Sequence, residues 1–358
     1  MKPTRKRLLD WYRANKRAMP WRETRDPYAI WISEAMLQQT RVETVIPYWE
    51  NFLALFPDVH ALATADSDDV LGAWAGLGYY SRARNLQAAA RLIDENYGGK
   101  VPDDAESLQS LPGIGRYTAG AVASIAFDRP EPVLDGNVKR VLTRLLGIRE
   151  DIGRPAVVER LWKEAGVLVQ GPHPGDLNQA LMELGATLCT PRSPRCESCP
   201  VSQSCDARNE GDAESLPIKM RKKPARIVEA VAALVIRRGK VLAVRRPSRG
   251  LLAGLWDLLG GDLSAGEAPR TGLTRTLRER AGLEVTRASA IGAIEHVFTH
   301  RKLTLHVYRV TTSTDRIRLD GFAGHKWISP RAFHSLPHAT LTAKALDVVL
   351  SPRDRVPN

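Results

Sequence analysis

The sequence predicts a multidomain protein with a mainly α-helical N-terminal part and an α+β C-terminal domain. At 358 residues the chain is longer than one hydrophobic core usually serves, so two or more domains are expected. Apolar residues recur with a helical period up to about residue 211, and strand-like alternation begins after residue 226. Between the two parts, residues 212–226 are polar and basic and contain two prolines, which indicates a linker.

The N-terminal part, residues 1–211, is predicted to begin with a helix whose apolar side includes Leu8 and Tyr12. A further helix is expected in the segment DPYAIWISEAMLQQT, because Asp26 suits the N-cap and Pro27 suits the first helical position. Helical periodicity then continues, interrupted by short polar connectors.

The segment LPGIGRYTAG (111–120) is predicted to be a glycine-rich turn between two helices. Pro112 ends one helix, and a helix of small residues follows. Gly113 and Gly115 allow a left-handed or unobstructed backbone, so that N–H groups at the second helix could approach a DNA phosphate. The alternative is a turn with no ligand.

The C-terminal domain, residues 227–358, is predicted to mix strands and helices. Residues 227–247 have the pattern of two strands joined at Arg-Arg-Gly-Lys, and residues 302–310 alternate as a strand does. The intervening arginine-rich segment, PRTGLTRTLRERAG, is predicted to be a helix that ends at Gly282.

The formal charge is +12, which favours a polyanionic partner. Residues 227–358 hold 21 Lys and Arg against 11 Asp and Glu, so this part alone carries +10. A generally arginine-rich surface is the alternative, and charge alone does not decide between them. No apolar run reaches the roughly 20 residues that a membrane helix needs, and no signal sequence is expected.

The four cysteines lie close together and predict a metal site. Cys189, Cys196, Cys199 and Cys205 have the spacing C-x6-C-x2-C-x5-C. A disulfide-stabilised secreted protein would spread its cysteines along the chain, so the cluster indicates a reducing, intracellular compartment. Four thiolates could bind one zinc ion or a cubane cluster, and the spacing leaves both open.

Two carboxylates are candidates for catalysis. Glu34 lies in an apolar helical stretch, which should raise its pKa toward that of a general acid; an ordinary exposed glutamate is the alternative. Asp135 directly precedes a predicted helix, so it is expected to be an N-cap whose helix N–H groups keep it ionised with a lowered pKa. Such a pair suits cleavage of a glycosidic bond, here an N-glycosidic one.

The segments LPGIGRYTAG and LDGNVKR, together with the cysteine loop, resemble the endonuclease III superfamily of helix-hairpin-helix DNA glycosylases. WISEAMLQQT, GLGYYSRARN and a Nudix-like second domain are similar to the adenine glycosylases of the MutY type. The resemblance implies a six-helix lobe at about residues 25–130. It also implies a second lobe, formed by the N-terminal helix and about residues 131–211, that holds a [4Fe-4S] cluster.

The resemblance further implies a base-excision-repair enzyme that removes adenine from double-stranded DNA containing A:8-oxoguanine or A:G mispairs. Such an enzyme is expected to act as a monomer in the bacterial cytoplasm, associated with the nucleoid. Glu34 resembles the catalytic acid, Asp135 the charge-stabilising carboxylate, and Tyr117 and Asn137 the residues that position the base and that carboxylate. Further matches are adenine-pocket contacts (Arg22 and Glu183) and residues that wedge into the duplex where adenine is flipped out (Gln39 and Tyr79).

One position separates the subfamilies of this superfamily. Members that also cut the DNA backbone carry a lysine after the hairpin glycines for Schiff-base chemistry, whereas this chain has Tyr117 there. The resemblance therefore implies a monofunctional glycosylase that leaves an abasic site. An endonuclease III-like enzyme for oxidised pyrimidines is the nearest alternative, and a non-catalytic iron–sulfur DNA-binding protein is another.

The C-terminal domain departs from the Nudix hydrolase box, because Thr276 and Arg280 replace two of its carboxylates. A Mg²⁺ site would lose ligands by this change, so we expect a binding domain rather than a nucleotide hydrolase. Phe298, Thr299 and His300 resemble the loop of this family that contacts 8-oxoguanine.

The iron–sulfur cluster is expected to fold the cysteine loop and to support DNA binding. A redox role is not expected, since base excision transfers no electron.

Overall fold

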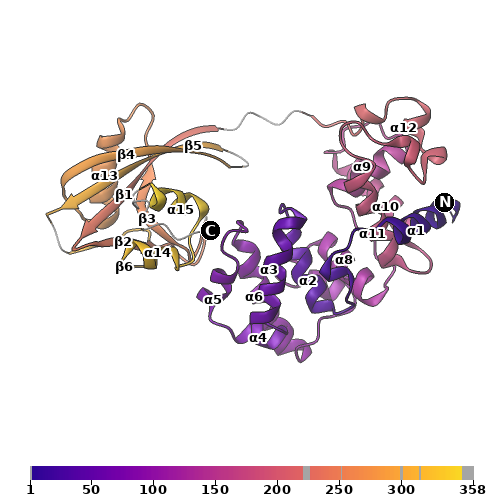
Figure 1. The fold of residues 1–358 in the computed structure, drawn as a ribbon, viewed down its shortest axis with the longest axis horizontal. Coiled ribbons are helices and arrows are strands. Elements are labelled where there is room, and N and C mark those ends of the chain that lie inside the picture. Colours follow the sequence, from indigo (N-terminus) through magenta and orange to yellow (C-terminus); the bar gives the residue numbers. More distant parts are fainter. Residues whose placement is uncertain (1, 221–225, 251, 299–300, 314–315, 349–358) are drawn as a thin grey trace. The chain divides into compact units, whose positions relative to one another are not determined.

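The structure, a computed structural model, describes residues 2–220, 226–250, 252–298, 301–313 and 316–348. Internal contacts divide the chain into two units (Figure 1). The first comprises Met1–Ala65 and Asn85–Lys222, and the second comprises Asp66–Arg84 and Lys223–Asn358. The first unit is built of helices and the second around a mixed β-sheet, which confirms the predicted fold class.

The helices of the first unit are short and are joined by short connections. In chain order they are α1 (Lys2–Asn15), η1 (Pro20–Arg22), α2 (Pro27–Leu37), α3 (Val42–Leu55), α4 (Val59–Thr64), α6 (Ser81–Tyr97, whose first residues belong to the second unit), α7 (Ala105–Gln109), α8 (Arg116–Phe127), α9 (Gly136–Leu145), α10 (Pro155–Val169), α11 (Pro174–Thr187), η2 (Cys196–Ser198), η3 (Ser202–Ser204), α12 (Asp206–Asn209) and η4 (Ala213–Ser215).

Helix α2 begins where the sequence predicts. The Asp26 carboxylate accepts a hydrogen bond from the backbone N–H of Tyr28 at 3.0 Å, and Pro27 occupies the first helical position. Every residue from Tyr28 to Met36 is buried, so the helix lies in the core on all sides. A glutamate on this helix is therefore held away from water.

Helices α1, α9, α10 and α11 share one hydrophobic core. Leu8 and Tyr12 of α1 are buried there, as expected, together with Leu142 of α9 and Leu181 of α11. Three of the four cysteines pack against the edge of this core. The core thus fixes the ends of α9 and α11 next to the cysteine loop.

The segment before the sheet is partly packed rather than extended. Leu216, in the predicted linker, is buried, and its carbonyl accepts a hydrogen bond from the Arg144 guanidinium at 3.0 Å. The carbonyl of Ile218 accepts from the N–H of Ile152 at 3.1 Å. These contacts attach the first half of residues 212–226 to the first unit.

The sheet of the second unit has the strand order β4-β5-β1-β3-β2-β6. Its strands are β1 (Arg226–Arg237), β2 (Lys240–Arg245), β3 (Trp256–Asp262), β4 (Val285–Val297), β5 (Arg301–Thr312) and β6 (Gly324–Ile328). Strands β1 and β5 pair in parallel, and the other neighbours are antiparallel. The predicted turn between β1 and β2 has positive φ at Arg238 and Gly239, as a tight hairpin requires.

Helices cover both faces of this sheet (Figure 1). Leu273 and Leu277 of α13 (Pro269–Ala281) pack on one face, and Phe333 of α14 (Pro330–His334) and Leu346 of α15 (Thr340–Asp347) pack on the other. Helix α13 ends before Gly282, which has φ +65°, as the sequence predicts. Helix α5 (Ser67–Ala73) also belongs to this unit.

No helix within the described ranges is both long and apolar enough to cross a membrane.

Candidate active site

A cavity of about 350 Å³ in the first unit brings together residues that are far apart in the sequence. Glu34 from α2 and Asp135 at the start of α9 both line it, although 101 positions separate them. Tyr117, Asn137, Arg22 and Glu183 line it as well. The cavity is therefore lined by both carboxylates of the predicted pair, by the two expected positioning residues and by the two expected adenine-pocket contacts.

Glu34 is buried, with 6% of its surface exposed. The Tyr117 hydroxyl donates a hydrogen bond to Glu34 Oε2 at 2.9 Å and lies 3.3 Å from the Met182 sulfur. Burial raises the pKa of Glu34 to about 7, the negative charge of Asp135 adds to the rise, and the Tyr117 hydrogen bond and Arg22 oppose it. Glu34 thus holds a proton up to neutral pH, in the direction expected for a general acid.

Asp135 caps α9 as predicted, because its carboxylate accepts a hydrogen bond from the N–H of Val138 at 2.7 Å. Its pKa, however, is raised, so the expectation of a lowered pKa was wrong. Burial is the larger effect, and the backbone N–H groups of Val138 and Asn137 together with Arg140 oppose it. These hydrogen bonds and the positive charge of Arg140 favour the ionised form of Asp135.

Asn137 connects the cavity to the cysteine loop through a residue that sequence reasoning missed. Arg140, one turn further along α9, donates to Asn137 Oδ1 at 2.9 Å and to the carbonyl of Cys189 at 2.7 Å. Gly185 of α11 packs directly on Asn137, where an added Cβ would lie only 2.6 Å from the Asn137 Cβ. The spacing of Asn137 and Arg140 was the available signal, since side chains three residues apart share a helix face.

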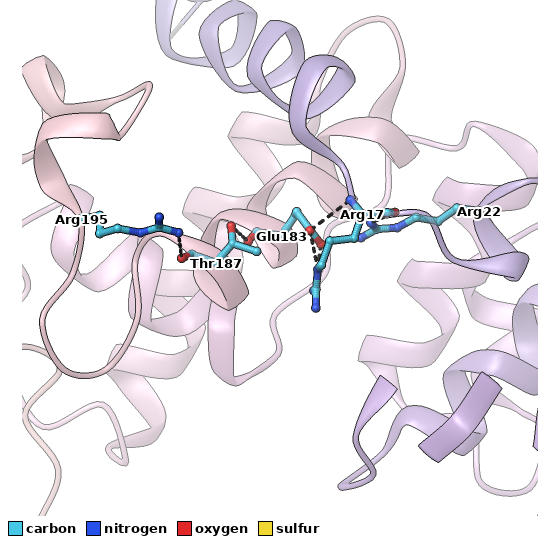
Figure 2. A network of polar contacts seen from close by, with 5 residues as sticks. All are labelled: Arg17, Arg22, Glu183, Thr187 and Arg195. Carbon is cyan, nitrogen blue, oxygen red and sulfur yellow. Dashed lines mark hydrogen bonds and ion pairs between the residues drawn. The ribbon is translucent and has the colours of Figure 1, made fainter. Parts of the chain in front are cut away.

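Glu183 also lines the cavity, and its side chain is only 1% exposed. Figure 2 shows it beside Arg17 and Arg22. Its carboxylate accepts hydrogen bonds from Arg17 Nε at 2.6 Å, Arg17 Nη2 at 3.1 Å and Arg22 Nη2 at 2.9 Å. Burial alone would raise the pKa of Glu183, but the hydrogen bonds from Arg17 and Arg22 lower it. Sequence reasoning missed Arg17, because no local pattern connects it to a partner 166 positions away.

The same network continues along α11 to the cysteine loop (Figure 2). The Thr187 hydroxyl donates to the Glu183 carbonyl at 2.8 Å, and Arg195 donates to the Thr187 carbonyl at 2.9 Å. Arg195 therefore satisfies a carbonyl at the C-terminal end of α11, which is a favourable place for a cation.

Gln39 and Tyr79, the expected wedge residues, are both exposed and both have a strained backbone. Gln39 has φ +60° just after α2, and Tyr79 has φ +47° and is 50% exposed. Residues other than glycine rarely adopt this conformation, and it recurs at functional sites. They belong to different units of the structure.

The two glycines of the turn before α8 have different structural roles. Gly113 has φ +78°, and a Cβ there would lie 2.6 Å from the Asn85 Cβ, so the fold requires glycine at this position. Gly115 is the N-cap of α8 and has open space around it. A phosphate could therefore approach the backbone at Gly115 without obstruction.

The four cysteines are all free thiols within the loop 189–205. Buried Arg144 donates to Cys189 Sγ at 3.3 Å and to the carbonyl of Thr190 at 2.7 Å, which holds the start of the loop. Burial and the neighbouring cysteines raise the pKa of Cys199 to about 11. A positively charged iron–sulfur core bound by four thiolates would offset this cost, so the donor set fits a cluster.

Within the described ranges, no three His, Cys, Asp or Glu side chains converge closely enough to hold a single metal ion.

In the second unit, Phe298 is half-buried against the sheet core, 4.5 Å from the His296 ring and 5.0 Å from the Arg301 guanidinium. Thr299 and His300 lie outside the described residues. Two residues replace carboxylates of the Nudix hydrolase box. Thr276 is buried, and Arg280 donates a hydrogen bond to the carbonyl of Gly260 at 3.0 Å.

Three family models match the chain. The HhH-GPD superfamily base excision DNA repair protein model matches residues 32–166, and the NUDIX domain model matches residues 231–348. The iron-sulfur binding domain of endonuclease III matches residues 189–205, which contain all four cysteines. These matches identify a DNA N-glycosylase of base excision repair, and the cysteine loop binds a [4Fe-4S] cluster.

The adenine DNA glycosylase of Homo sapiens is 38% identical over 397 residues, covering 95% of this chain and 73% of the human protein. The adenine DNA glycosylase of Mus musculus is 40% identical over 358 residues, covering 85% of this chain and 70% of that protein. A solved structure of a thermostable thymine-DNA glycosylase matches with a TM-score of 0.54 and 30% identity, covering 58% of this chain and 98% of that one. The extent and identity of these matches show that the chain belongs to the adenine DNA glycosylase family.

Proposed function

We propose that the chain removes adenine from mispairs with 8-oxoguanine or guanine by hydrolysing the N-glycosidic bond, and that it leaves an abasic site. The observation that carries this proposal is the shared cavity, in which buried Glu34 has a pKa of about 7 and Asp135 accepts a hydrogen bond from the N–H of Val138 at the start of α9. One carboxyl group can then donate a proton while the other stays negative, which is the division that glycosidic cleavage needs.

In the proposed reaction, protonated Glu34 donates its proton to a ring nitrogen of adenine. The bond between the base and the sugar breaks, and its electron pair leaves with the base. The Asp135 carboxylate stabilises the positive charge that develops on the sugar. Water then attacks the sugar carbon, and its proton returns to Glu34.

The cavity also suits adenine rather than guanine. Glu183 is a hydrogen-bond acceptor because its pKa is lowered, and Arg22, beside it, is a donor. Adenine presents an amino donor next to a ring-nitrogen acceptor, which matches this pair. A guanine held in the same orientation presents an oxygen acceptor next to a ring N–H donor. This is the opposite order, so it would leave both protein groups badly paired.

We infer that strand cleavage is weak or absent. The Tyr117 hydroxyl donates a hydrogen bond to Glu34, and its pKa is raised well above its usual value by burial and by Glu34. A buried neutral phenol cannot form the Schiff base that an amine nucleophile forms with the abasic sugar.

We further propose that the Nudix-like domain binds the lesion strand and does not hydrolyse nucleotides. Its charge of +10 favours the DNA backbone, and Phe298, Thr299 and His300 resemble in sequence the loop of this family that contacts 8-oxoguanine. Two acidic residues of the box, Glu267 and Glu279, are both ion-paired with Arg275, which competes with Mg²⁺ for them. The partner is double-stranded DNA, and the enzyme is expected to act as an intracellular monomer.

The decisive experiment incubates the protein with labelled duplexes containing adenine opposite 8-oxoguanine, guanine or thymine, or containing thymine glycol, with and without alkali. We expect rapid excision from the first, slower excision from A:G, none from A:T, and strand breaks only after alkali. Excision of thymine glycol instead would support the endonuclease III-like alternative.

Glu34→Gln should bind the A:8-oxoguanine duplex with unchanged affinity and lose excision by at least about a hundredfold, the usual contribution of general acid catalysis. The matched control is Glu50→Gln, an exposed glutamate of α3 that does not line the cavity, which should keep the wild-type rate. Full activity of Glu34→Gln would contradict the assignment of the acid.

A further inference from the structure

The hydrogen bonds of Glu183 conflict with its proposed role as the acceptor for adenine. An ionised carboxylate offers about four lone-pair sites. Four N–H donors already approach Glu183: Arg22 Nη2 at 2.9 Å, Arg17 Nε at 2.6 Å, Arg17 Nη2 at 3.1 Å and the backbone N–H of Arg17 at 3.3 Å. The amino group of adenine can bind Glu183 only if one of these donors leaves.

The exposure of the two arginines indicates which one leaves. The side chain of Arg22 is 7% exposed and stacks 5.4 Å from the Tyr12 ring, so it is built into the wall of the cavity. The side chain of Arg17 is 42% exposed and lies on the connection between α1 and η1, at the mouth of the cavity. Arg17 can therefore move into solvent without opening the core, whereas Arg22 cannot. Figure 2 shows both arginines converging on Glu183.

We propose that Arg17 is a displaceable cap on the adenine pocket: in the DNA-free protein its guanidinium occupies the Glu183 oxygens to which the adenine amino group binds, and it leaves when the flipped base enters. The proposal rests on the proposed function and names the residue that controls entry to its pocket. Arg17 acts through Glu183 and is a positioning residue.

The chemistry of the substrate favours this exchange. A guanidinium released from a carboxylate binds a phosphate equally well, and duplex DNA supplies phosphates beside the flipped nucleotide. DNA would thus take Arg17 and uncover Glu183 in one event, whereas free adenine brings no phosphate and must displace Arg17 unaided. The cap would therefore make the pocket bind adenine in DNA better than free adenine, including the released product.

The test measures binding of free adenine to the DNA-free protein by calorimetry, for wild type, Arg17→Gln and the control Arg13→Gln. Arg13 is also ion-paired with an acidic residue of α11, Asp176, at 3.7 Å, but it does not line the cavity. A cap that is closed in nine molecules of ten weakens apparent binding about tenfold. We therefore expect Arg17→Gln to bind adenine about tenfold more tightly than wild type, and Arg13→Gln to match wild type.

Two further readouts separate a cap from a merely structural residue. Purine, which lacks the exocyclic amino group of adenine, should bind no better to Arg17→Gln than to wild type, because the uncovered carboxylate binds that amino group. Arg17→Gln should also keep its melting temperature, since Arg22 still neutralises Glu183. Equal or weaker adenine binding by Arg17→Gln, or none detectable, overturns the proposal.

Excision from the A:8-oxoguanine duplex is measured in parallel under single-turnover conditions. If the wild type fails to release adenine, the proposed function is wrong whatever Arg17 does. If the wild type releases adenine while Arg17→Gln gains no affinity for the free base, only the cap is wrong.

Discussion

At the residue scale, the chemistry depends on how burial and hydrogen bonding divide two similar carboxyl groups. Glu34 receives one hydrogen bond, from Tyr117, and its pKa rises to about 7. Asp135 is also buried, but the N–H groups at the start of α9 and the charge of Arg140 limit the rise in its pKa. The surroundings of each group therefore set its pKa: burial favours the protonated form of Glu34, whereas N–H donors and Arg140 favour the ionised form of Asp135.

The rate of excision should follow the protonation of Glu34. Its pKa is raised, so the protonated, active form predominates below about pH 7 and is lost as the pH rises above that value. Tyr117→Phe removes a hydrogen bond that lowers this pKa, so the midpoint of the pH–rate profile should move to higher pH. Single-turnover excision rates of wild type and Tyr117→Phe between pH 5.5 and 9 give the two midpoints.

The control is Tyr97→Phe, at an exposed tyrosine of α6, which should leave the midpoint unchanged. A midpoint for Tyr117→Phe at or below that of the wild type would show that the hydroxyl does not act on the ionisation of Glu34.

At the element scale, the ends of helices position the site. Asp135 is the N-cap of α9, Tyr117 lies in the first turn of α8, and Glu183 lies in the C-terminal half of α11. The turn before α8 requires glycine at one position, because Gly113 combines a positive φ with close contact to Asn85. Its neighbour Gly115 has neither constraint.

Alanine at these two glycines should separate stability from DNA binding. Gly113→Ala should lower the free energy of unfolding by about 1 to 3 kcal/mol, because alanine would be strained in the left-handed backbone of this position and its Cβ would meet Asn85. Gly115→Ala should lower it by less than about 1 kcal/mol, since that position is open. Urea unfolding measures both.

If the N–H groups at Gly115 bind a phosphate, Gly115→Ala should also weaken duplex binding while the protein stays folded. Unchanged DNA affinity would leave Gly115 with a purely structural role.

At the scale of the whole molecule, the cysteine loop supports the active site through two routes. Arg140 joins the carbonyl of Cys189 to Asn137, and Arg195 joins the loop to the end of α11, one turn after Glu183. The cluster supplies the binding energy that holds four mutually repelling thiolates in this loop. Losing it should therefore disturb both the fold and the cavity.

Cys199→Ser should reduce iron content and visible absorbance and should lower the melting temperature by at least about 5 °C, or roughly 2 kcal/mol for a unit of this size. Ser198→Ala, at the exposed neighbouring position, is the control and should keep the cluster. A variant that loses iron yet keeps its melting temperature and DNA affinity would contradict the structural role.

The sequence by itself determined whatever depends on local pattern. Periodicity predicted the helical and mixed α/β parts, the caps at Asp26 and Asp135 followed from residue type before a helix, and cysteine spacing predicted a metal site. These features are decided within a few residues, so they are visible in one dimension.

Only the tertiary structure decided the rest, because the quantities involved arise between distant segments. Burial and the charge of Asp135 raised the pKa of Glu34 against the opposing hydrogen bond of Tyr117. Burial also outweighed the helix N–H groups at Asp135, against the prediction from its position. Arg17 meets Glu183 across 166 positions, and no local pattern encodes that contact. Desolvation and long-range pairing depend on how the whole chain packs, so they appear only once it has folded.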